Sequence, residues 1–290
     1  MKELVVISGK GGTGKTSLTA SFAYLAGENT ILADYDVDAS DLHILLEPKI
    51  KKTYQFYGGK KANIIKEKCI GCAKCQEICR FDAVKNVDDK FEINKIDCEG
   101  CGYCYRICPT DAIEFKDNLS GEWYISKSRF SSTLIFAKLD IAEENSGKLV
   151  TEIKEVARNL ANENNKDLLI SDGAPGIGCP VIASLSNANY ILIVTEPSLS
   201  GFHDLKRILE LVKHFGYSAG CIINKYDINK KITKEIEIFS HNNELEIIGK
   251  IPYSDSFPKS LVLKQTVVEF DKSDIGKTVE NCWGKLQSKL

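Results

Sequence analysis

Long apolar runs and a strong charge of either sign are both missing from this 290-residue sequence. No run approaches the roughly 18 apolar residues of a membrane span, so we do not expect a membrane protein. The 38 basic and 40 acidic residues leave a formal charge of -2, which argues against a protein that coats nucleic acid or an anionic membrane. The N-terminal apolar run Leu4–Ile7 is too short for a signal peptide. We therefore expect a cytoplasmic protein.

Histidine is also scarce, whereas cysteine is not. The four histidines have no metal-binding spacing, and no nucleophile–base pair stands out. Eight of the eleven cysteines, by contrast, lie in two short runs. These runs are Cys69, Cys72, Cys75, Cys79 and Cys98, Cys101, Cys104, Cys108. Because a cytoplasmic chain is not expected to form structural disulfides, clustered cysteines indicate metal ligands.

Short apolar strands alternate with helical stretches through most of the chain. Each expected strand ends at a polar or glycine-containing turn, as buried parallel strands do. The expected strands are 4–7, 30–33, 168–170, 190–194, 219–223 and 247–249, and the expected helices are 15–27, 147–162 and 202–215. This alternation predicts an α/β fold with a doubly wound, mostly parallel sheet.

Residues 60–118 interrupt the alternation with an internal repeat. Residues 68–84 match residues 97–113 at an offset of 29, so each cysteine of the first run has a counterpart in the second. Asp82 and Asp111 also correspond, which extends the repeat beyond the cysteines. We therefore predict a small α+β domain at 60–118, inserted into an α/β domain formed by 1–59 and 119–290.

A glycine-rich phosphate-binding motif follows the first expected strand. The sequence G-K-G-G-T-G-K-T fits G-x-x-x-x-G-K-[ST] between a strand and a helix. Its backbone N–H groups and the helix N-terminus suit a phosphate, Lys15 would reach the β- and γ-phosphates, and Thr16 would bind Mg²⁺. The expected nucleotide-binding residues here are Gly9, Gly11, Gly12, Thr13, Gly14, Lys15, Thr16 and Ser17.

Lys10, a second lysine early in this loop, resembles the signature of the MinD/ParA class of P-loop ATPases, which includes the nitrogenase iron protein. The resemblance implies that Lys10 reaches across a dimer to the partner's nucleotide. Asp36, in D-Y-D-V-D, looks like the first switch and would position the attacking water. Asp172 and Gly176, in D-G-A-P-G, look like the second switch, which holds hydrated Mg²⁺ and senses the γ-phosphate. Lys10, Lys15, Asp36 and Asp172 are thus the expected catalytic residues.

The sequence N-K-x-D begins at Asn224. In GTPases this pattern recognises guanine, whereas the resemblance to MinD/ParA proteins implies ATP, with an asparagine here contacting adenine. A buried cap of the strand end is the structural alternative for Asn224. We expect ATP, leave GTP open, and add Pro252 to the nucleotide-binding residues.

The spacing C-x2-C-x2-C-x3-C, present twice, is that of bacterial ferredoxins with two [4Fe–4S] clusters. In that pattern three cysteines of a run hold one cluster and the fourth reaches the other. The expected ligands are Cys69, Cys72, Cys75 and Cys108 for one cluster, and Cys98, Cys101, Cys104 and Cys79 for the other. Zinc is the alternative, but four-cysteine zinc sites draw two C-x2-C pairs from separate segments.

Three cysteines lie outside these runs. Cys179 lies where, by resemblance, the nitrogenase iron protein has one ligand of a cluster shared between subunits, but no cysteine stands between 120 and 171 to complete such a cluster. We expect Cys179 to be a small buried residue and Cys221 to lie in the core. Cys282 is expected on a C-terminal helix that packs against the sheet.

Together these parts resemble MinD-like ATPases that carry an inserted ferredoxin domain. The resemblance implies that the protein binds ATP, Mg²⁺ and two [4Fe–4S] clusters. It also implies an ATP-dependent dimer, formed by identical chains or with a paralogous ATPase, and this dimer would gate electron transfer to a redox partner. Two alternatives stay open. One is a carrier that assembles clusters, like Mrp-type scaffolds, and delivers them to an accepting protein. The other is a MinD-like positioning or regulatory ATPase with redox-sensing clusters. Neither a nucleic acid nor a membrane is expected as a partner.

Overall fold

The computed structural model describes residues 1–140, 143 and 146–290, and it divides into two compact units. The first unit comprises Met1–Tyr54, Trp123–Lys138 and Ser146–Leu290, and the second comprises Gln55–Glu122 with the described part of Leu139–Asn145. The expected boundaries after residues 59 and 118 both fall inside strands. Strands β3 (Lys49–Ile64) and β6 (Ile113–Lys127) each contain residues of both units, so at these two crossings the chain passes between the units inside a strand.

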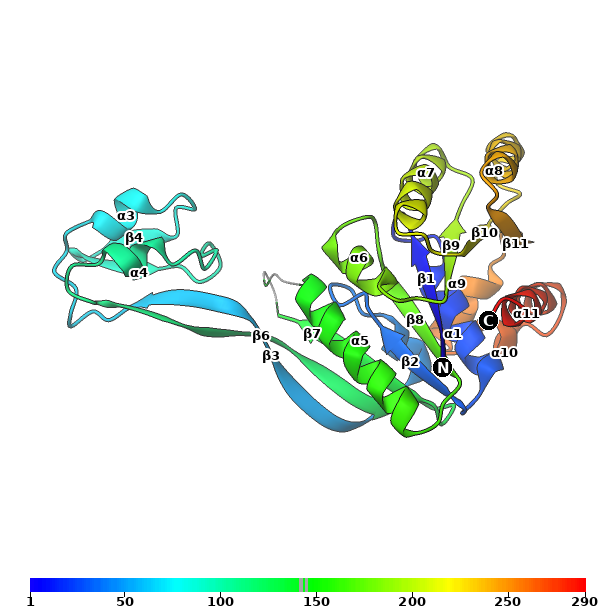
Figure 1. The fold of residues 1–290 in the computed structure, drawn as a ribbon, viewed down its shortest axis with the longest axis horizontal. Helices are drawn as coiled ribbons and strands as arrows, with labels where there is room; N and C mark the ends of the chain where they lie inside the picture. The colour runs from blue at the N-terminus through cyan, green and yellow to red at the C-terminus, as the bar shows by residue number, and fades with distance from the viewer. Residues whose placement is uncertain (141–142, 144–145) are drawn as a thin grey trace. The chain divides into compact units, whose positions relative to one another are not determined.

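A sheet of nine strands among the described residues has the order β11-β10-β9-β1-β8-β2-β7-β6-β3 (Figure 1). Its remaining strands are β1 (Lys2–Ser8), β2 (Thr30–Asp34), β7 (Thr133–Leu139), β8 (Leu168–Pro175), β9 (Tyr190–Thr195), β10 (Ala219–Asn224) and β11 (Glu246–Ile251). From β11 to β7 every neighbouring pair is parallel. The expected mostly parallel sheet is therefore confirmed.

Helices cover both faces of this sheet because alternate residues of each central strand point in opposite directions. Leu4 and Val6 join a core with α1 and α11, whereas Val5 and Ile7 join a second core with α6, α7 and α8. The helices of the first unit are α1 (Lys15–Ala26), α2 (Leu42–Leu46), α5 (Ser146–Glu163), α6 (Cys179–Leu185), α7 (Leu199–His214), α8 (Lys230–Asn242), α9 (Ser256–Val262), α10 (Val267–Phe270) and α11 (Asp274–Gln287). This is the predicted doubly wound arrangement.

The second unit repeats its backbone as well as its sequence. Helices α3 (Lys74–Ile78) and α4 (Tyr103–Ile107) are related by the offset of 29 seen in the sequence. Left-handed backbone recurs at the same offset in the pairs Gly71 and Gly100, Ala73 and Gly102, and Asp82 and Asp111. An antiparallel hairpin, β4 (Val84–Val87) and β5 (Lys90–Ile93), lies between the two copies in sequence. The internal repeat is therefore confirmed.

The three scattered cysteines have different surroundings. Cys221 is fully buried in β10, and Cys282 on α11 is 2% exposed, as expected. Beside it Trp283 stacks on Phe22 at 5.5 Å between ring centroids, so α11 packs on the core through its apolar face. Cys179, expected to be buried, is exposed, because it stands at the first position of α6. None of the helices in the described part of the chain has the length and apolarity to cross a bilayer.

Candidate nucleotide site and cysteine cavity

A cavity of about 620 Å³ opens at the carboxyl ends of the central strands, where parallel α/β sheets bind ligands. Asp36 lies just beyond β2, Asn224 ends β10, and both line the cavity. The phosphate-loop residues that line it are Gly11, Gly12, Thr13, Gly14, Lys15, Thr16 and Ser17. The structure thus brings together the phosphate loop, Asp36 of the expected first switch and the N-K-x-D segment.

The phosphate loop needs glycine for both conformation and space. Gly14 has a φ of 91°, and a Cβ there would lie 2.4 Å from the side-chain nitrogen of Asn224. That amide donates to the carbonyl of Thr13 at 2.7 Å, while its oxygen accepts the N–H of Lys225 at 3.0 Å. Asn224 is 2% exposed, and its side chain joins the end of β10 to the phosphate loop.

Lys15 lines the cavity and pairs with Asp172, the aspartate of the expected second switch. Its ammonium is 2.9 Å from Oδ2 of Asp172 and 3.6 Å from the carboxylate of Asp36. The Thr16 hydroxyl donates to the same Oδ2 at 2.6 Å, and the Thr19 hydroxyl donates to Oδ1 at 2.8 Å. Burial lowers the pKa of Lys15, but the surrounding carboxylates outweigh it and raise the value.

Asp34 is a buried residue of this site that the sequence motifs did not single out. It accepts hydrogen bonds from the N–H of Asp36, the hydroxyl of Ser40 and the N–H of Leu42, so it shapes the segment expected to act as the first switch. Burial, with the negative charge of Asp172 next in size, raises the pKa of Asp34 to about 7. Its signal in the sequence is its place as the last residue of a buried strand.

Several predicted residues lie outside the cavity lining. Gly9 packs against α7, where an added Cβ would meet Cβ of Asp204 at 2.2 Å. Gly176 has a φ of 90°, and its N–H donates to the carbonyl of Ser8 at 2.9 Å. Pro252 directly precedes Tyr253, which does line the cavity.

The apolar part of the cavity was not foreseen from the sequence. Asp227 of N-K-x-D accepts the N–H of Tyr253 at 2.7 Å, so this carboxylate orders the loop after β11. Six of the lining residues that are apolar or aromatic come from α2, α9 and that loop, and they are Ile44, Leu45, Tyr253, Phe257, Pro258 and Leu261. A planar base stacks well in such surroundings.

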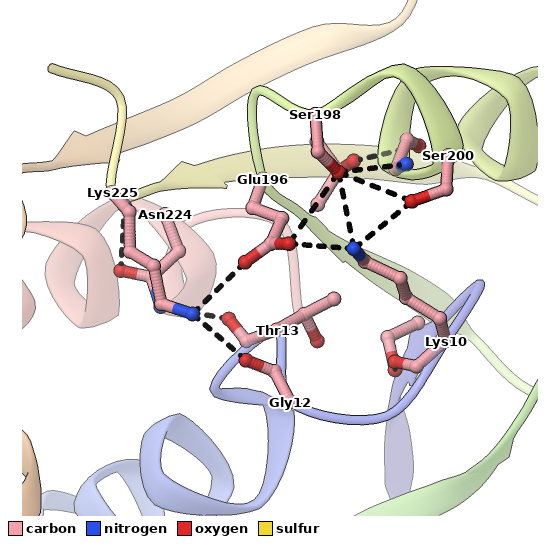
Figure 2. Close-up of polar contacts among 11 residues, drawn as sticks. Lys10, Gly12, Thr13, Glu196, Ser198, Ser200, Asn224 and Lys225 are labelled. Carbon is pink, nitrogen blue, oxygen red and sulfur yellow. Dashed lines mark hydrogen bonds and ion pairs between the residues drawn. The ribbon is translucent and has the colours of Figure 1, made fainter. Parts of the chain in front are cut away.

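Lys10 is held within its own chain (Figure 2). Its ammonium lies 2.6 Å from Glu196 and donates to the hydroxyls of Ser198 and Ser200, each at 3.1 Å. Glu196 also pairs with Lys225 at 2.9 Å. Neither Glu196 nor Lys225 had an assigned role from the sequence, because their contacts join segments far apart in the chain.

In the second unit a cavity collects cysteines from both runs. Its lining includes Cys69, Cys72 and Cys75 of the first run and Cys108 of the second. An apolar cluster contacts six of the eight cysteines, and it comprises Ala62, Ile64, Cys75, Val84, Phe91 and Ile113, with Cys69, Cys79, Cys98, Cys104 and Cys108 packed against it. Cys72 and Cys101 are exposed. All eight thiols are free.

The thiols of the second run also influence one another. Burial, followed by the charges of neighbouring thiols, raises the pKa of Cys104 to about 11. For Cys108 the effect of burial is outweighed by hydrogen bonds, including the N–H of Ala112 at 3.3 Å, so its pKa is lowered. Within the described residues no three His, Cys, Asp or Glu side chains converge tightly enough to hold a single metal ion.

Known proteins resemble this chain in sequence and in fold. The profile of the CobQ/CobB/MinD/ParA nucleotide binding domain matches residues 4–267. Two uncharacterised proteins of Methanocaldococcus jannaschii are similar: one is 33% identical over 287 residues (98% of this chain, 96% of the relative), the other 30% over 260 residues (79% and 83%). The septum site-determining protein MinD of Pyrococcus horikoshii, complexed with Mg-ADP, has a TM-score of 0.60 at 14% identity, over 98% of this chain and 95% of MinD. At that identity the structural likeness concerns the fold alone.

Proposed function

This chain belongs to the CobQ/CobB/MinD/ParA nucleotide-binding family, and from that premise we propose an ATPase whose nucleotide-driven dimer switch controls electron transfer through two [4Fe–4S] clusters. The observation that carries the proposal is the cavity shared by Cys69, Cys72, Cys75 and Cys108. A fourth thiol contributed by the other run is what two-cluster ferredoxins require. The cavity measures about 20 Å³, so the loops that carry the thiols have to move apart when a four-iron cube binds.

In the nucleotide site, the N–H groups of the phosphate loop bind phosphate, and the ion pair between Lys15 and Asp172 then separates. Lys15 exchanges Asp172 for the β- and γ-phosphates, which releases the carboxylate. Thr16 and Asp172 would supply the oxygen atoms near a bound Mg²⁺, an ion that typically takes only one or two protein carboxylates. When bound, Mg²⁺ would neutralise charge on the phosphates. Asp36 positions the attacking water.

On the cysteine side, the chain supplies thiolates and an apolar cluster beside them. Ile64, Val84 and Phe91 belong to that cluster, and the Ala112 N–H stabilises the Cys108 thiolate. Solvent exposure and hydrogen bonds to sulfur tune the potential of an iron–sulfur site. When bound, the clusters supply one-electron transfer at low potential. Cys98, Cys101, Cys104 and Cys79 form the second ligand set.

The switch acts in a dimer, in which Lys10 reaches the nucleotide of the second chain. The second chain is either an identical copy or a paralogous ATPase, and two relatives in Methanocaldococcus jannaschii each match most of this chain. A redox protein is the further partner. Strands β3 and β6 have residues in both units, so a change at the first switch, which precedes β3, has a continuous path to the cysteine unit.

The iron content of anaerobically purified protein tests the cluster assignment. We expect about eight irons per chain, and about four in the Cys75→Ser variant with nucleotide binding retained. Cys179→Ser is the matched control, because it removes an exposed thiol of the first unit and should keep all the iron. Two tightly bound zinc ions and no iron would contradict the proposal.

Coupling between the two units tests the electron-transfer role. ATP is titrated into the oxidised and the dithionite-reduced forms of the Asp36→Asn variant, which is used because the substitution prevents turnover. Thermodynamic linkage requires two free-energy changes to be equal: the effect of ATP on the reduction potential of the clusters, and the effect of cluster reduction on the affinity for ATP. We expect the affinity for ATP to change about tenfold on reduction. Equal affinities would instead favour a cluster carrier or a MinD-like regulatory ATPase.

A further inference from the structure

One carboxylate in the loop after β9 binds two lysines of the nucleotide site (Figure 2). Oε1 of Glu196 lies 2.6 Å from Nζ of Lys10, and Oε2 lies 2.9 Å from Nζ of Lys225. Each carboxylate oxygen therefore serves one ammonium. Burial raises the pKa of Glu196, but the hydrogen bonds from both lysines outweigh burial and hold the value below its usual range. Glu196 is consequently charged at neutral pH.

The ammonium of Lys10 is fully occupied by these contacts. It donates to the hydroxyls of Ser198 and Ser200 in addition to Glu196. An ammonium has three N–H donors, so none is left for a phosphate of a second chain while the contacts last. Ser198 is fixed in turn, because it caps α7 by accepting the N–H of Gly201 at 3.0 Å.

Lys225 connects the same carboxylate to the phosphate loop. Its ammonium donates to the carbonyl of Gly12 at 2.9 Å, and its φ of 53° is uncommon for a residue other than glycine. The contacts therefore run without a break from Gly12 through Lys225 and Glu196 to Lys10. A phosphate that reorients the loop at Gly12 changes the hydrogen-bond partners of Lys225. Because Lys225 shares Glu196 with Lys10, the contacts of Lys10 change as well.

We propose that Glu196 is a positioning residue that holds Lys10 in its own protomer, through a carboxylate shared with Lys225, and so sets how readily the ATP-dependent dimer forms. The proposal rests on the proposed function, in which Lys10 acts across the dimer. Loading the phosphate loop weakens the hold of Glu196, and Lys10 then becomes available to the second nucleotide.

Glu196→Gln tests this role because it removes the charge and keeps the side-chain shape. In nucleotide-free protein, limiting acetic anhydride followed by peptide mass spectrometry measures the reactivity of Lys10. We expect about a three- to fivefold rise, the scale of a partly exposed ion pair. Glu237→Gln is the matched control, because Glu237 pairs with Lys250 at 2.7 Å and its loss should leave Lys10 labelling unchanged.

Sedimentation with ATP and Mg²⁺, in an Asp36→Asn background, measures the dimer. Glu196→Gln should lower its dissociation constant about three- to fivefold, and adding Lys10→Ala should abolish that gain. Ser200→Ala removes one contact of Lys10 without touching Lys225, so it should raise Lys10 labelling by a smaller factor. It provides a second variant should Glu196→Gln fold poorly.

Unchanged Lys10 labelling in both variants would overturn the proposal. A rise in labelling accompanied by a weaker dimer would also overturn it, because Glu196 would then support the dimer. A gain in dimerisation that survives Lys10→Ala would show that Glu196 acts through other residues, and the proposal would fail. If labelling rises but the wild type forms no dimer with ATP, Glu196 still holds Lys10 and the cross-dimer role in the proposed function is wrong.

Discussion

Replacing Lys15 by alanine should destabilise the nucleotide-free protein as well as abolish nucleotide binding. The lysine is the cation between Asp172, at 2.9 Å, and Asp36, at 3.6 Å, and its side chain is 6% exposed. Removing one partner of a buried ion pair leaves an unpaired charge, which costs about 3–5 kcal/mol. Because Asp36 is partly exposed, we expect a loss of about 3 kcal/mol, equivalent to a fall in melting temperature of roughly 6–12 °C for a unit of this size.

The stability lost in the Lys15→Ala variant should depend on pH, because Lys15 affects the protonation of Asp34. With its pKa raised to about 7 by burial, the folded state keeps a proton that the unfolded state releases above about pH 4. This group therefore lowers wild-type stability as the pH rises from about 4 to about 7. Lys15 limits that rise in pKa, so its removal extends the penalty above about pH 7. The difference between wild type and Lys15→Ala should be larger at about pH 8 than at about pH 6.

Urea titration followed by tryptophan fluorescence measures the first unit alone, because both tryptophans, Trp123 and Trp283, lie in it. Lys250→Ala is the control, since it breaks an exposed pair with Glu237 and should cost less than about 1 kcal/mol. Equal midpoints for wild type and Lys15→Ala, or a difference that ignores pH, would refute the role of Lys15 as the counter-charge.

Three further substitutions have distinct expected outcomes. Trp283→Ala should lower the free energy of unfolding by about 3–5 kcal/mol, measured by thermal circular dichroism, because Trp283 is 5% exposed and stacks on Phe22. Asp36→Asn should keep ATP binding and slow phosphate release about a hundredfold or more in a steady-state assay. Burial raises the pKa of Glu269, but hydrogen bonds led by Arg129 hold it below the ordinary 4.5. The ion pair between Glu269 and Arg129 therefore stabilises the fold above about pH 4.5, and this contribution is lost as the pH falls below that value. In the Glu269→Gln variant the urea midpoint should consequently change less with pH in the acid range than it does in the wild type.

Features that depend on neighbouring residues were predictable from the sequence alone. The phosphate loop, the central strands and the cysteine repeat each rest on spacing within a short segment, where glycine conformation, apolar periodicity and helix starts act locally. The repeat predicts its own backbone so closely that Ala73 takes the left-handed conformation of its counterpart Gly102. Strand β7 was missed although Leu134–Ala137 is apolar, because its place beside β2 depends on pairing between distant segments.

The tertiary structure alone decided which charges meet and which residues are buried. Asp172 pairs with Lys15 across more than 150 residues of sequence, and Glu196 joins two lysines that no local motif relates. The burial that raises the pKa of Asp34 likewise comes from elements distant in the chain. Electrostatic interaction and desolvation depend on separation in space and on what covers a group, and neither quantity is encoded by the spacing of residues along the sequence.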